Sequence, residues 1–509
     1  MIEPEELDAV VCPHLAALDA PGAAVAVVHP EGPPLVRCYG WADIATRRPV
    51  DTTTRFRIGS VTKTMTTIAV LQLVERGLLG LDDPVDAHLK GIEVRQREPG
   101  AEAVTIRHLL THTSGIGEFP SWRSTRHPLR ALGASRPGTE MPSLRDLVAD
   151  GVVAEVPPGT KWAYSNVGFT LLGMVAENVT GQPFGELLGD GVFGPLSMSG
   201  ASLARDADVD ATLATGYRGR RGVAAPTRPF DIAALPAGGA HATISDMAAY
   251  AGGVLWAAAG DGRLLTRDTA RLMMTPQFGI DPRLPKVGLS WWLDGIDSTF
   301  TAGHGGTVPG FSTGLVLAPG AGVGVAVLLN RGVLPSAFFG GGHVASAVLR
   351  RIVGTEDPAV TPAASDFDGS GRPDSWTDKA GVYRPAPGLG TNMRALHYLG
   401  GEIEVLDAGD HLVARAPVGP FRAGLRLYGA TPADPDAYSV SYGGYVLPFV
   451  FSRDSSGAVD AVNTGFVPCP FRLVRCPTGT RTYASHVRRG TAVAAGLLAA
   501  RAVLRGRRR

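Results

Sequence analysis

One stretch of the chain decides the fold that we expect: Phe56-Arg57-Ile58-Gly59-Ser60-Val61-Thr62-Lys63. It opens a run in which apolar residues recur at helical spacing, at Met65, Ile68, Leu71 and Val74. This spacing predicts a buried helix, on which positions three apart share a face. Lys63 can therefore reach the Ser60 hydroxyl, and an amine that burial keeps partly neutral can take the proton of a serine. Taken alone, the pair favours a plainer hypothesis, a serine cap followed by a solvent-exposed lysine.

Strand patterns stand at both ends of the first 355 residues, with helical patterns between them. Residues 22–28 and 35–40 alternate like a β-hairpin around a Pro/Gly turn. Three further strand runs are separated by Gly, Pro and Asp turns: residues 288–293, 313–317 and 324–329. Residues 336–353 are typical of a closing helix. We predict an α/β fold in which one antiparallel sheet, flanked by helices and completed by both ends, carries a helical region between them.

The remaining chain divides by composition. Residues 356–378 are polar and rich in Asp, Pro, Gly and Ser, as a linker would be. Short strand patterns punctuated by turns then recur over 379–480, which predicts a separate all-β domain, a small barrel. The basic tail, 481–509, favours a solvated segment over an amphipathic helix on a membrane surface.

Composition excludes some classes of function. The 509 residues carry 48 Lys and Arg against 47 Asp and Glu, so no global charge points to nucleic acid. The four cysteines form no C-x-x-C pair, which argues against a disulfide framework or a zinc site. The acidic N-terminus lacks a signal pattern, and no apolar run reaches the roughly 20 residues of a membrane span. We therefore expect a cytoplasmic protein without a metal or cofactor.

Two further motifs carry chemistry. Tyr164-Ser165-Asn166 stands just before a helical pattern that begins near Val167. A tyrosine beside an ammonium can relay protons, and Asn166 offers a donor and an acceptor. The other motif, Gly303-His304-Gly305-Gly306-Thr307, falls in the strand-rich region, where glycines allow close approach of a substrate. A backbone N–H from this edge, paired with that of Ser60, would form an oxyanion hole. The plainer hypotheses are a helix cap at Asn166 and a surface turn at His304.

Together, Ser-x-x-Lys, Tyr-x-Asn and His-x-Gly in this order resemble the β-lactamase-related serine hydrolases. That group includes class C β-lactamases, D-stereospecific peptidases and esterases. Three further stretches fit the resemblance, which covers about residues 10–350: Thr105 to Gly115, Pro158-Gly159-Thr160 and Pro236-Ala237-Gly238-Gly239. The trailing β domain resembles the lipocalin-like appendages of some members.

The resemblance implies that Ser60 is the nucleophile, that Lys63 and Tyr164 share the acid–base work, and that Asn166 binds substrate. Residues His304, Gly305, Gly306 and Thr307 would line the substrate site. His304 stands where β-lactamases of this fold usually have the Lys of Lys-Thr-Gly. Since His is only partly charged near neutral pH, it suits a β-lactam carboxylate less well than an ammonium does. We therefore expect hydrolysis of a small ester or amide. The alternatives are a D-amino-acid peptidase, a weak β-lactamase, or a catalytically quiet member that binds a ligand or partner.

Three other patterns favour structural roles. Gly310-Phe311-Ser312-Thr313-Gly314 matches the G-x-S-x-G nucleophile elbow, but a strand pattern follows Ser312 where the elbow needs a helix. His108 and His112 have the i, i+4 spacing of zinc ligands but lack the adjacent Glu, so we interpret both as scaffold. Residues 366–374 echo a calcium loop, yet Thr377 replaces the bidentate Glu, which favours a solvated linker.

Overall fold

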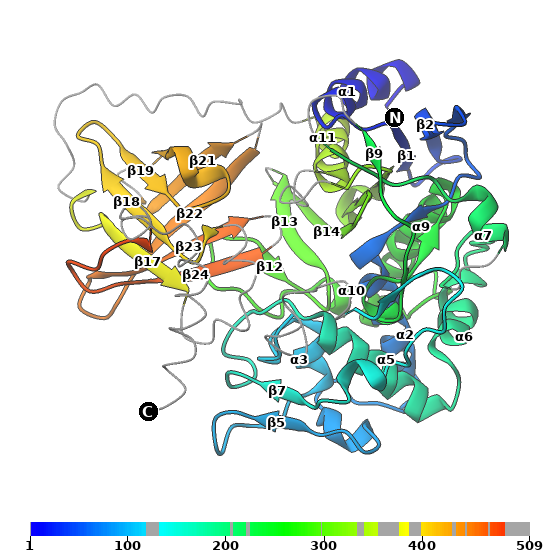
Figure 1. Cartoon of the computed structure of the whole chain (residues 1–509), viewed down its shortest axis with the longest axis horizontal. Coiled ribbons are helices and arrows are strands. Elements are labelled where there is room, and N and C mark those ends of the chain that lie inside the picture. Colours follow the sequence, from blue (N-terminus) through cyan, green and yellow to red (C-terminus); the bar gives the residue numbers. More distant parts are fainter. Residues whose placement is uncertain are drawn as a thin grey trace. The chain divides into compact units, whose positions relative to one another are not determined.

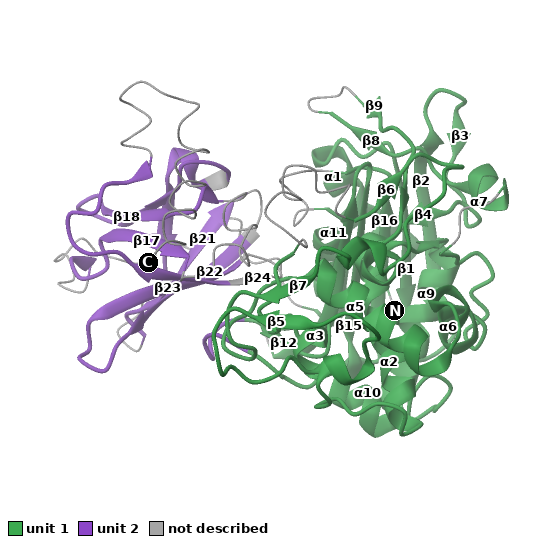
Figure 2. Ribbon diagram, turned by 60° about the horizontal axis from the view of Figure 1, so that its bottom comes forward, with its two compact units in different colours: residues 1–278, 285–357 green, residues 279–284, 358–509 purple. Residues whose placement is uncertain are grey.

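The computed structural model describes residues 2–118, 132–203, 207–219, 224–296, 298–332, 340–354, 376–385, 399–429, 434–442, 445–466 and 469–483. The chain forms two compact units (Figure 2). Residues 1–278 and 285–357 belong to the first unit, and residues 279–284 and 358–509 belong to the second.

An eight-stranded antiparallel sheet forms the centre of the first unit, in the order β12-β13-β14-β15-β16-β1-β2-β3 (Figure 1). Its strands are β1 (Gly22–Val28), β2 (Leu35–Asp43), β3 (Arg48–Pro49), β12 (Lys286–Val287), β13 (Trp292–Ile296), β14 (Thr299–Val308), β15 (Phe311–Ala318) and β16 (Val323–Leu329). β1 pairs with β16, with Ala23 opposite Leu329 and Val28 opposite Gly324. The N-terminal hairpin thus completes a sheet made by much later strands, which confirms the predicted fold class.

Both faces of this sheet are covered. Along β1, Ala24, Ala26 and Val28 point into the larger core, which includes α9 (Ile244–Ala259). The alternate β1 residues join a smaller core with α1 (Pro4–Ala17) and α11 (Gly341–Val353). Because neither face meets water, β1 and β16 are apolar throughout instead of alternating with polar residues.

The region between β3 and β12 is mainly helical, with α2 (Thr62–Glu75) in its core. Besides α9, its other described α-helices are α3 (Ile106–Leu110), α5 (Asn166–Thr180), α6 (Phe184–Leu188), α7 (Ala207–Thr212), α8 (Leu235–Gly238) and α10 (Arg267–Met273). Its strand pairs are β4 (Phe56–Arg57) with β11 (His241–Ala242), β5 (Val94–Gln96) with β7 (Val152–Ala154), β6 (Ala134–Ser135) with β10 (Asp231–Ile232), and β8 (Tyr217–Arg218) with β9 (Ala225–Pro226).

Helix α2 (Thr62–Glu75) is buried along most of its length, as its apolar spacing predicts. Its threonine hydroxyls satisfy neighbouring polar groups. Thr62 Oγ1 accepts from the Ala240 N–H at 3.2 Å, and Thr66 Oγ1 donates to the Pro236 carbonyl at 2.8 Å. Thr64 Oγ1 accepts from the Tyr250 hydroxyl at 2.7 Å, and burial raises the pKa of Tyr250. These bonds fix the position of the helix that follows Ser60.

The second unit contains a closed eight-stranded barrel. Its strands are β17 (Gly381–Pro385), β18 (Ile403–Asp407), β19 (Leu412–Arg415), β20 (Leu425–Tyr428), β21 (Ala437–Tyr442), β22 (Tyr445–Arg453), β23 (Val459–Phe466) and β24 (Cys469–Arg475). β24 pairs back with β17, which closes the barrel and leaves no free sheet edge. Phe451 lies in its core, with ring centroids 6.0 Å from Tyr383 and 5.7 Å from both Tyr438 and Phe449.

Residues 279–284 belong to the barrel unit although they lie between α10 and β12 in the chain. Within that unit Arg283 bonds the Asp281 carboxylate at 2.8 Å, the Asp434 carboxylate at 2.9 Å and the Phe451 carbonyl at 3.2 Å. The first unit therefore sends a short segment into the second, and the sequence patterns did not indicate this.

One predicted strand changes in detail, and four predictions lie wholly or partly outside the described residues. The strand expected at 288–293 begins only at Trp292, because Ser290 takes a left-handed conformation with φ of 65°. Most of the 356–378 linker, the calcium-like loop, the start of the predicted 336–353 helix and residues 484–509 of the tail are not among the described residues.

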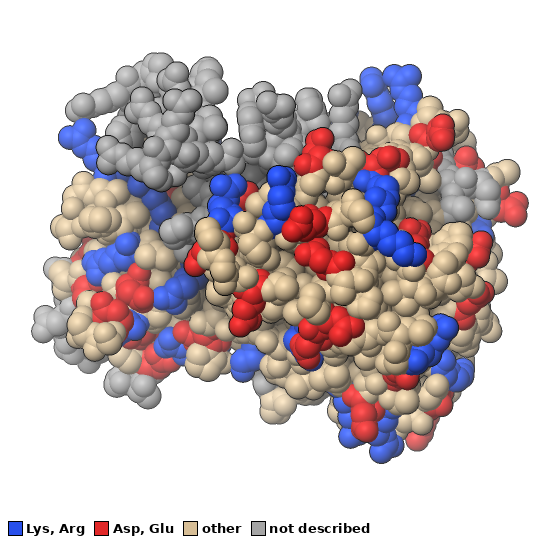
Figure 3. Space-filling view, turned by 90° about the horizontal axis from the view of Figure 1, so that it is seen from below, with Lys and Arg blue, Asp and Glu red and all other residues tan. Residues whose placement is uncertain are grey.

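Two observations concern the surface and the helices of the described part. On the face shown in Figure 3, acidic and basic side chains are intermingled, in keeping with the net charge of +1. Among the described residues, no helix has the length and apolar character needed to cross a membrane. The solvated tail, with contact to a membrane surface as its alternative, stays a prediction.

Candidate active site

Ser60 lies at the junction of a short 3₁₀ turn, Gly59–Val61, with α2. Gly59 has φ of +52°, a conformation that an L side chain rarely adopts. A Cβ at Gly59 would also lie 2.9 Å from the backbone nitrogen of Thr307. The glycine before Ser60 therefore allows this turn to pass close to β14.

Lys63 is fully buried one helical turn from Ser60. Its Nζ donates to Ser60 Oγ at 3.2 Å and to Asn166 Oδ1 at 2.8 Å. It also donates to the carbonyl oxygen of Ala237 in α8, within the Pro-Ala-Gly-Gly stretch. The solvent-exposed lysine of the plainer hypothesis is therefore wrong, and the predicted Ser60–Lys63 contact is present.

The Tyr164 hydroxyl donates to Ser60 Oγ at 2.8 Å. The Lys63 ammonium lies over the rings of Tyr164 and Phe169, 4.9 and 5.4 Å from their centroids. Ser60 Oγ is thus bonded by both the lysine and the tyrosine, which come from segments about a hundred residues apart.

Helix α5 begins at Asn166 with Ser165 as its N-cap. Ser165 Oγ accepts from the Gly168 N–H at 2.9 Å, which is the usual capping bond. The helix ends at Thr180 before Gly181, whose φ is 74°. Because Ser165 takes the capping role, the Asn166 side chain turns inward to Lys63, and the capping alternative for Asn166 is wrong.

The predicted His-Gly-Gly-Thr run lies within β14 and passes beside the turn of Ser60. A Cβ at Gly306 would lie 1.9 Å from the Ile58 carbonyl oxygen and 3.2 Å from the Ser60 nitrogen. Since only glycine fits there, the β14 backbone approaches closely the residue that carries the candidate nucleophile. His304 is 4% exposed, so it is not a surface residue in a turn.

His304 joins the group through Trp292 of β13. The two rings are 5.4 Å apart, and Trp292 stacks on Tyr164 with centroids 6.4 Å apart and planes at 21°. His304 Nδ1 is 2.7 Å from the Gly305 carbonyl oxygen, which can only accept a hydrogen bond. The proton of a neutral His304 is therefore on Nδ1, and Nε2 is its acceptor nitrogen.

The structure gives Ser312 a structural role. Ser312 lies inside β15, and its Oγ accepts from the Gly341 N–H at 3.0 Å. Since a strand continues where the elbow needs a helix, the interpretation of this G-x-S-x-G match as accidental is supported.

His108 and His112 have different roles. His108 completes the capping box at the start of α3, with Nδ1 accepting from the Thr105 N–H at 3.2 Å. His112 packs against Tyr164, with ring centroids 4.3 Å apart. Sequence reasoning placed His112 in the scaffold but missed this contact with the candidate site. The one sequence signal is its position at the start of the Thr113-Ser114-Gly115 turn.

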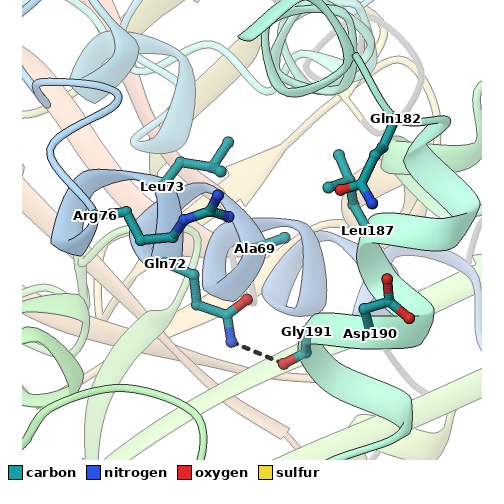
Figure 4. Close-up of a pocket in the computed structure, with 8 residues that line it drawn as sticks. All are labelled: Ala69, Gln72, Leu73, Arg76, Gln182, Leu187, Asp190 and Gly191. Atoms are coloured by element: carbon teal, nitrogen blue, oxygen red, sulfur yellow. Dashed lines mark hydrogen bonds between the residues drawn. The ribbon is translucent and has the colours of Figure 1, made fainter. Parts of the chain in front are cut away.

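A cavity of about 260 Å³ lies along the second half of α2 (Figure 4). Its lining includes Gln72, Arg76 and Asp190. Gln72 donates to the Gly191 carbonyl at 2.7 Å and so links α2 to the segment after α6. None of the predicted site residues lines this cavity.

A family model described as Beta-lactamase matches residues 7–349, which is most of the first unit. The chain belongs to the Beta-lactamase family. This agrees with the resemblance carried by the three motifs, all of which fall inside the matched residues.

Individual relatives of this family member differ in their described activities. The present chain is 35% identical over 246 residues to "Esterase EstB" of Burkholderia gladioli, and the match covers 43% of this chain and 61% of the esterase. The chain is 27% identical over 357 residues to a "D-aminopeptidase" of Cereibacter sphaeroides, covering 70% of this chain and 62% of that protein. The chain thus spans less than two thirds of either relative.

Among solved structures, the fold is similar to that of an octameric penicillin-binding protein homologue from Pyrococcus abyssi. The TM-score is 0.60 at 22% identity, over 93% of this chain and all of the other. At this identity the likeness concerns the fold alone.

Proposed function

We propose that the protein is a serine hydrolase that cleaves a small ester or amide through an acyl-Ser60 intermediate. The observation that carries the proposal is the double hydrogen bond at Ser60 Oγ, from Lys63 Nζ at 3.2 Å and the Tyr164 hydroxyl at 2.8 Å. A serine needs a neighbouring base to become a nucleophile, and both groups can serve.

The oxygens around Lys63 suit a base directed at Ser60. A neutral amine keeps two N–H donors and one lone pair. The Asn166 amide oxygen and the Ala237 carbonyl are acceptors only, so they hold the two donors. In this neutral form the bond to Ser60 is reversed from the one in which Nζ donates: the lone pair faces Ser60 Oγ, whose hydroxyl proton it can accept.

In the reaction we propose, Ser60 Oγ attacks the acyl carbon while its proton passes to the neutral amine of Lys63, or to the Tyr164 oxygen when the tyrosine has first lost its own proton. The tetrahedral intermediate expels the alkoxide or amine, which takes up that proton, and acyl-Ser60 remains. A water molecule then attacks the ester and gives a proton to the same base. Ser60 recovers its proton as the acid product leaves.

The close approach of β14 to the Ser60 turn supports an oxyanion hole. The backbone N–H groups of Ser60 and Thr307 lie on neighbouring segments, and only a glycine at position 306 lets these two segments pack so closely. Two N–H donors aimed at the developing oxyanion stabilise the transition state, and losing one such donor typically lowers kcat by about 10²–10³-fold.

His304 supports an ester or small amide as substrate. Unlike a lysine, a histidine carries no fixed positive charge for a carboxylate, and the Nδ1 contact with the Gly305 carbonyl leaves Nε2 as the acceptor of the neutral form. The esterase relative supports the same substrate class, and the D-aminopeptidase relative supports the alternative of a D-amino-acid amide. Burst kinetics with a nitrophenyl ester, a D-alanine anilide and a chromogenic cephalosporin would rank the three.

The test of the proposal is covalent labelling with a fluorophosphonate probe, followed by intact mass. We expect one label on the wild type and on Ser312→Ala, and none on folded Ser60→Ala. Labelling of Ser60→Ala would assign the nucleophile elsewhere. A folded wild type that neither reacts with the probe nor turns over any substrate would instead favour a catalytically quiet member.

A further inference from the structure

The buried side chain of His112 contacts the ring of Tyr164 in the first unit. His112 follows α3, is fully buried and has φ of 59°, which is uncommon for a residue other than glycine. The Tyr164 ring lies 4.3 Å from its imidazole at an angle of 33°, and the Phe169 ring lies at 5.2 Å. An unusual backbone conformation thus places this ring against the candidate acid–base tyrosine.

Hydrogen bonds from His112 hold the backbone on both sides of Tyr164. Its carbonyl oxygen accepts from the Ala163 N–H at 2.7 Å, and its Nδ1 accepts from the Ser165 N–H at 3.1 Å. A backbone N–H can only donate, so Nδ1 carries no proton and the neutral ring is protonated at Nε2. Protonation of Nδ1 would set two donors against each other.

Neighbouring bonds extend this support. Thr113 accepts from the Gly159 N–H at 2.8 Å, and Gly117 accepts from the Ser165 hydroxyl at 2.9 Å. Residues 112–117 therefore form a template: their hydrogen bonds hold the backbone of the segment that leads to Tyr164 in place. His112 is the member of this template that also contacts the tyrosine ring.

We propose that His112 is a positioning residue, which holds Tyr164 so that its hydroxyl meets Ser60 Oγ. This inference rests on the proposed acyl-Ser60 chemistry. The Nδ1 acceptor carries the effect, since it fixes the N–H next to Tyr164. Misplacing a reacting group by about 1 Å can lower a rate about 10²-fold.

The experiment measures the rate of Ser60 labelling by the fluorophosphonate, together with kcat and KM for the best ester. His112→Ala removes the Nδ1 acceptor, and we expect acylation to slow about 10–100-fold with little change in KM. His112→Asn places an amide oxygen near the position of Nδ1, and Asn tolerates positive φ. We expect this variant to recover acylation to within about 5-fold of wild type.

A double-mutant cycle separates positioning from a general loss of structure. In a Tyr164→Phe background, His112→Ala should slow acylation by less than about 3-fold, because the hydroxyl it positions is gone. His108→Ala is the matched control in α3, the helix just before His112; it loses the capping box and should lower Tm while leaving acylation within about 2-fold.

Two results would overturn the inference alone: unchanged acylation in His112→Ala, or an equal loss in the Tyr164→Phe background. An unlabelled wild type would overturn the proposed function and this inference with it. Near-ultraviolet circular dichroism of each variant confirms that the folded forms are being compared.

Discussion

At the scale of single residues, the buried Lys63 side chain is bonded to oxygens from three separate segments: Ser60, Asn166 and Ala237. A lysine with no exposed surface is uncommon, because removing an ammonium from water is costly unless it has partners. Such burial is typical of lysines whose amine interacts with a neighbouring protein group and is not hydrated.

Replacing Lys63 should therefore remove the base and leave Ser60 in place. We expect Lys63→Met, which keeps the apolar stem, to lower kcat for a short nitrophenyl ester about 10²–10⁴-fold. Lys90→Met is the matched control, since Lys90 is exposed and should have no effect. Unchanged turnover in Lys63→Met would rule out the proposed acid–base role.

Adjacent glycines of β14 allow a steric prediction. A Cβ at Gly306 would come within 1.9 Å of the Ile58 carbonyl, whereas the first atom met by a Cβ at Gly305 is the Thr313 carbonyl at 3.7 Å. Gly306→Ala should thus destabilise the first unit by about 1–3 kcal/mol through overpacking, and Gly305→Ala should leave its stability nearly unchanged. Chemical unfolding followed by tryptophan fluorescence measures both, and equal effects would contradict the close approach.

At the scale of elements, α1 and α11 meet on one face of the sheet through a pair of histidines. The rings of His14, in the last turn of α1, and His343, in the first turn of α11, are 4.8 Å apart. Burial, helped by the charges of His14 and Arg350, lowers the pKa of His343 to about 3. Folding thus holds this imidazole neutral between two helices.

The sign of the pH effect follows from that shift. Between pH 6.5 and 3 the unfolded chain binds a proton at His343 that the folded protein does not, so stability falls as the pH is lowered. At pH 5 the loss should be about 1–2 kcal/mol.

Urea unfolding at pH 7 and pH 5 tests the effect of His343. His343→Gln should remove most of the acid-induced loss, and His411→Gln in the barrel is the control. The same loss in His343→Gln and wild type would assign the acid sensitivity to other groups.

At the scale of the whole molecule, the chain crosses between its units more than once, because residues 279–284 belong with the barrel. Arg283 anchors this segment through Asp281, Asp434 and the Phe451 carbonyl. Since Asp434 and Phe451 are far along the chain, these bonds attach the short segment to the barrel itself.

Removing this anchor should weaken the barrel unit. We expect Arg283→Ala to lower its free energy of unfolding by about 1 kcal/mol, because charged hydrogen bonds to two segments are lost. Arg263→Ala is the matched control, since Arg263 makes the same pair with an aspartate two residues earlier, Asp261, but within the first unit. Hydrogen exchange resolved by peptide measures the two units separately, and unchanged protection of barrel peptides in Arg283→Ala would contradict the prediction.

Much of the fold was predictable because the local spacing of apolar residues indicates its helices and strands. The hairpin at residues 22–40, the helix after Ser60 and the strands near residues 313–329 follow from alternation and helical spacing. The start of β13 was not, since the left-handed Ser290 belongs to the connection by which β13 pairs with β12, and not to a pattern of apolar residues. The segment at 279–284 was missed for a similar reason: its partners lie more than 150 residues away.

In the candidate site, too, some features could be predicted from the sequence and others were decided only by the tertiary structure. The sequence determined that Lys63 can reach Ser60, because residues three apart on a helix share a face, and the structure decided that Lys63 is buried and not exposed to solvent. The other members could be named from motifs, but only the tertiary structure brought Tyr164 and Asn166 to the pair across 104 and 103 residues of chain. It also decided that Ser165 and not Asn166 caps α5, and that His112 packs against Tyr164. The physical reason is that hydrogen-bond partners are chosen by distance in space, whereas periodicity records only which side of an element faces the core.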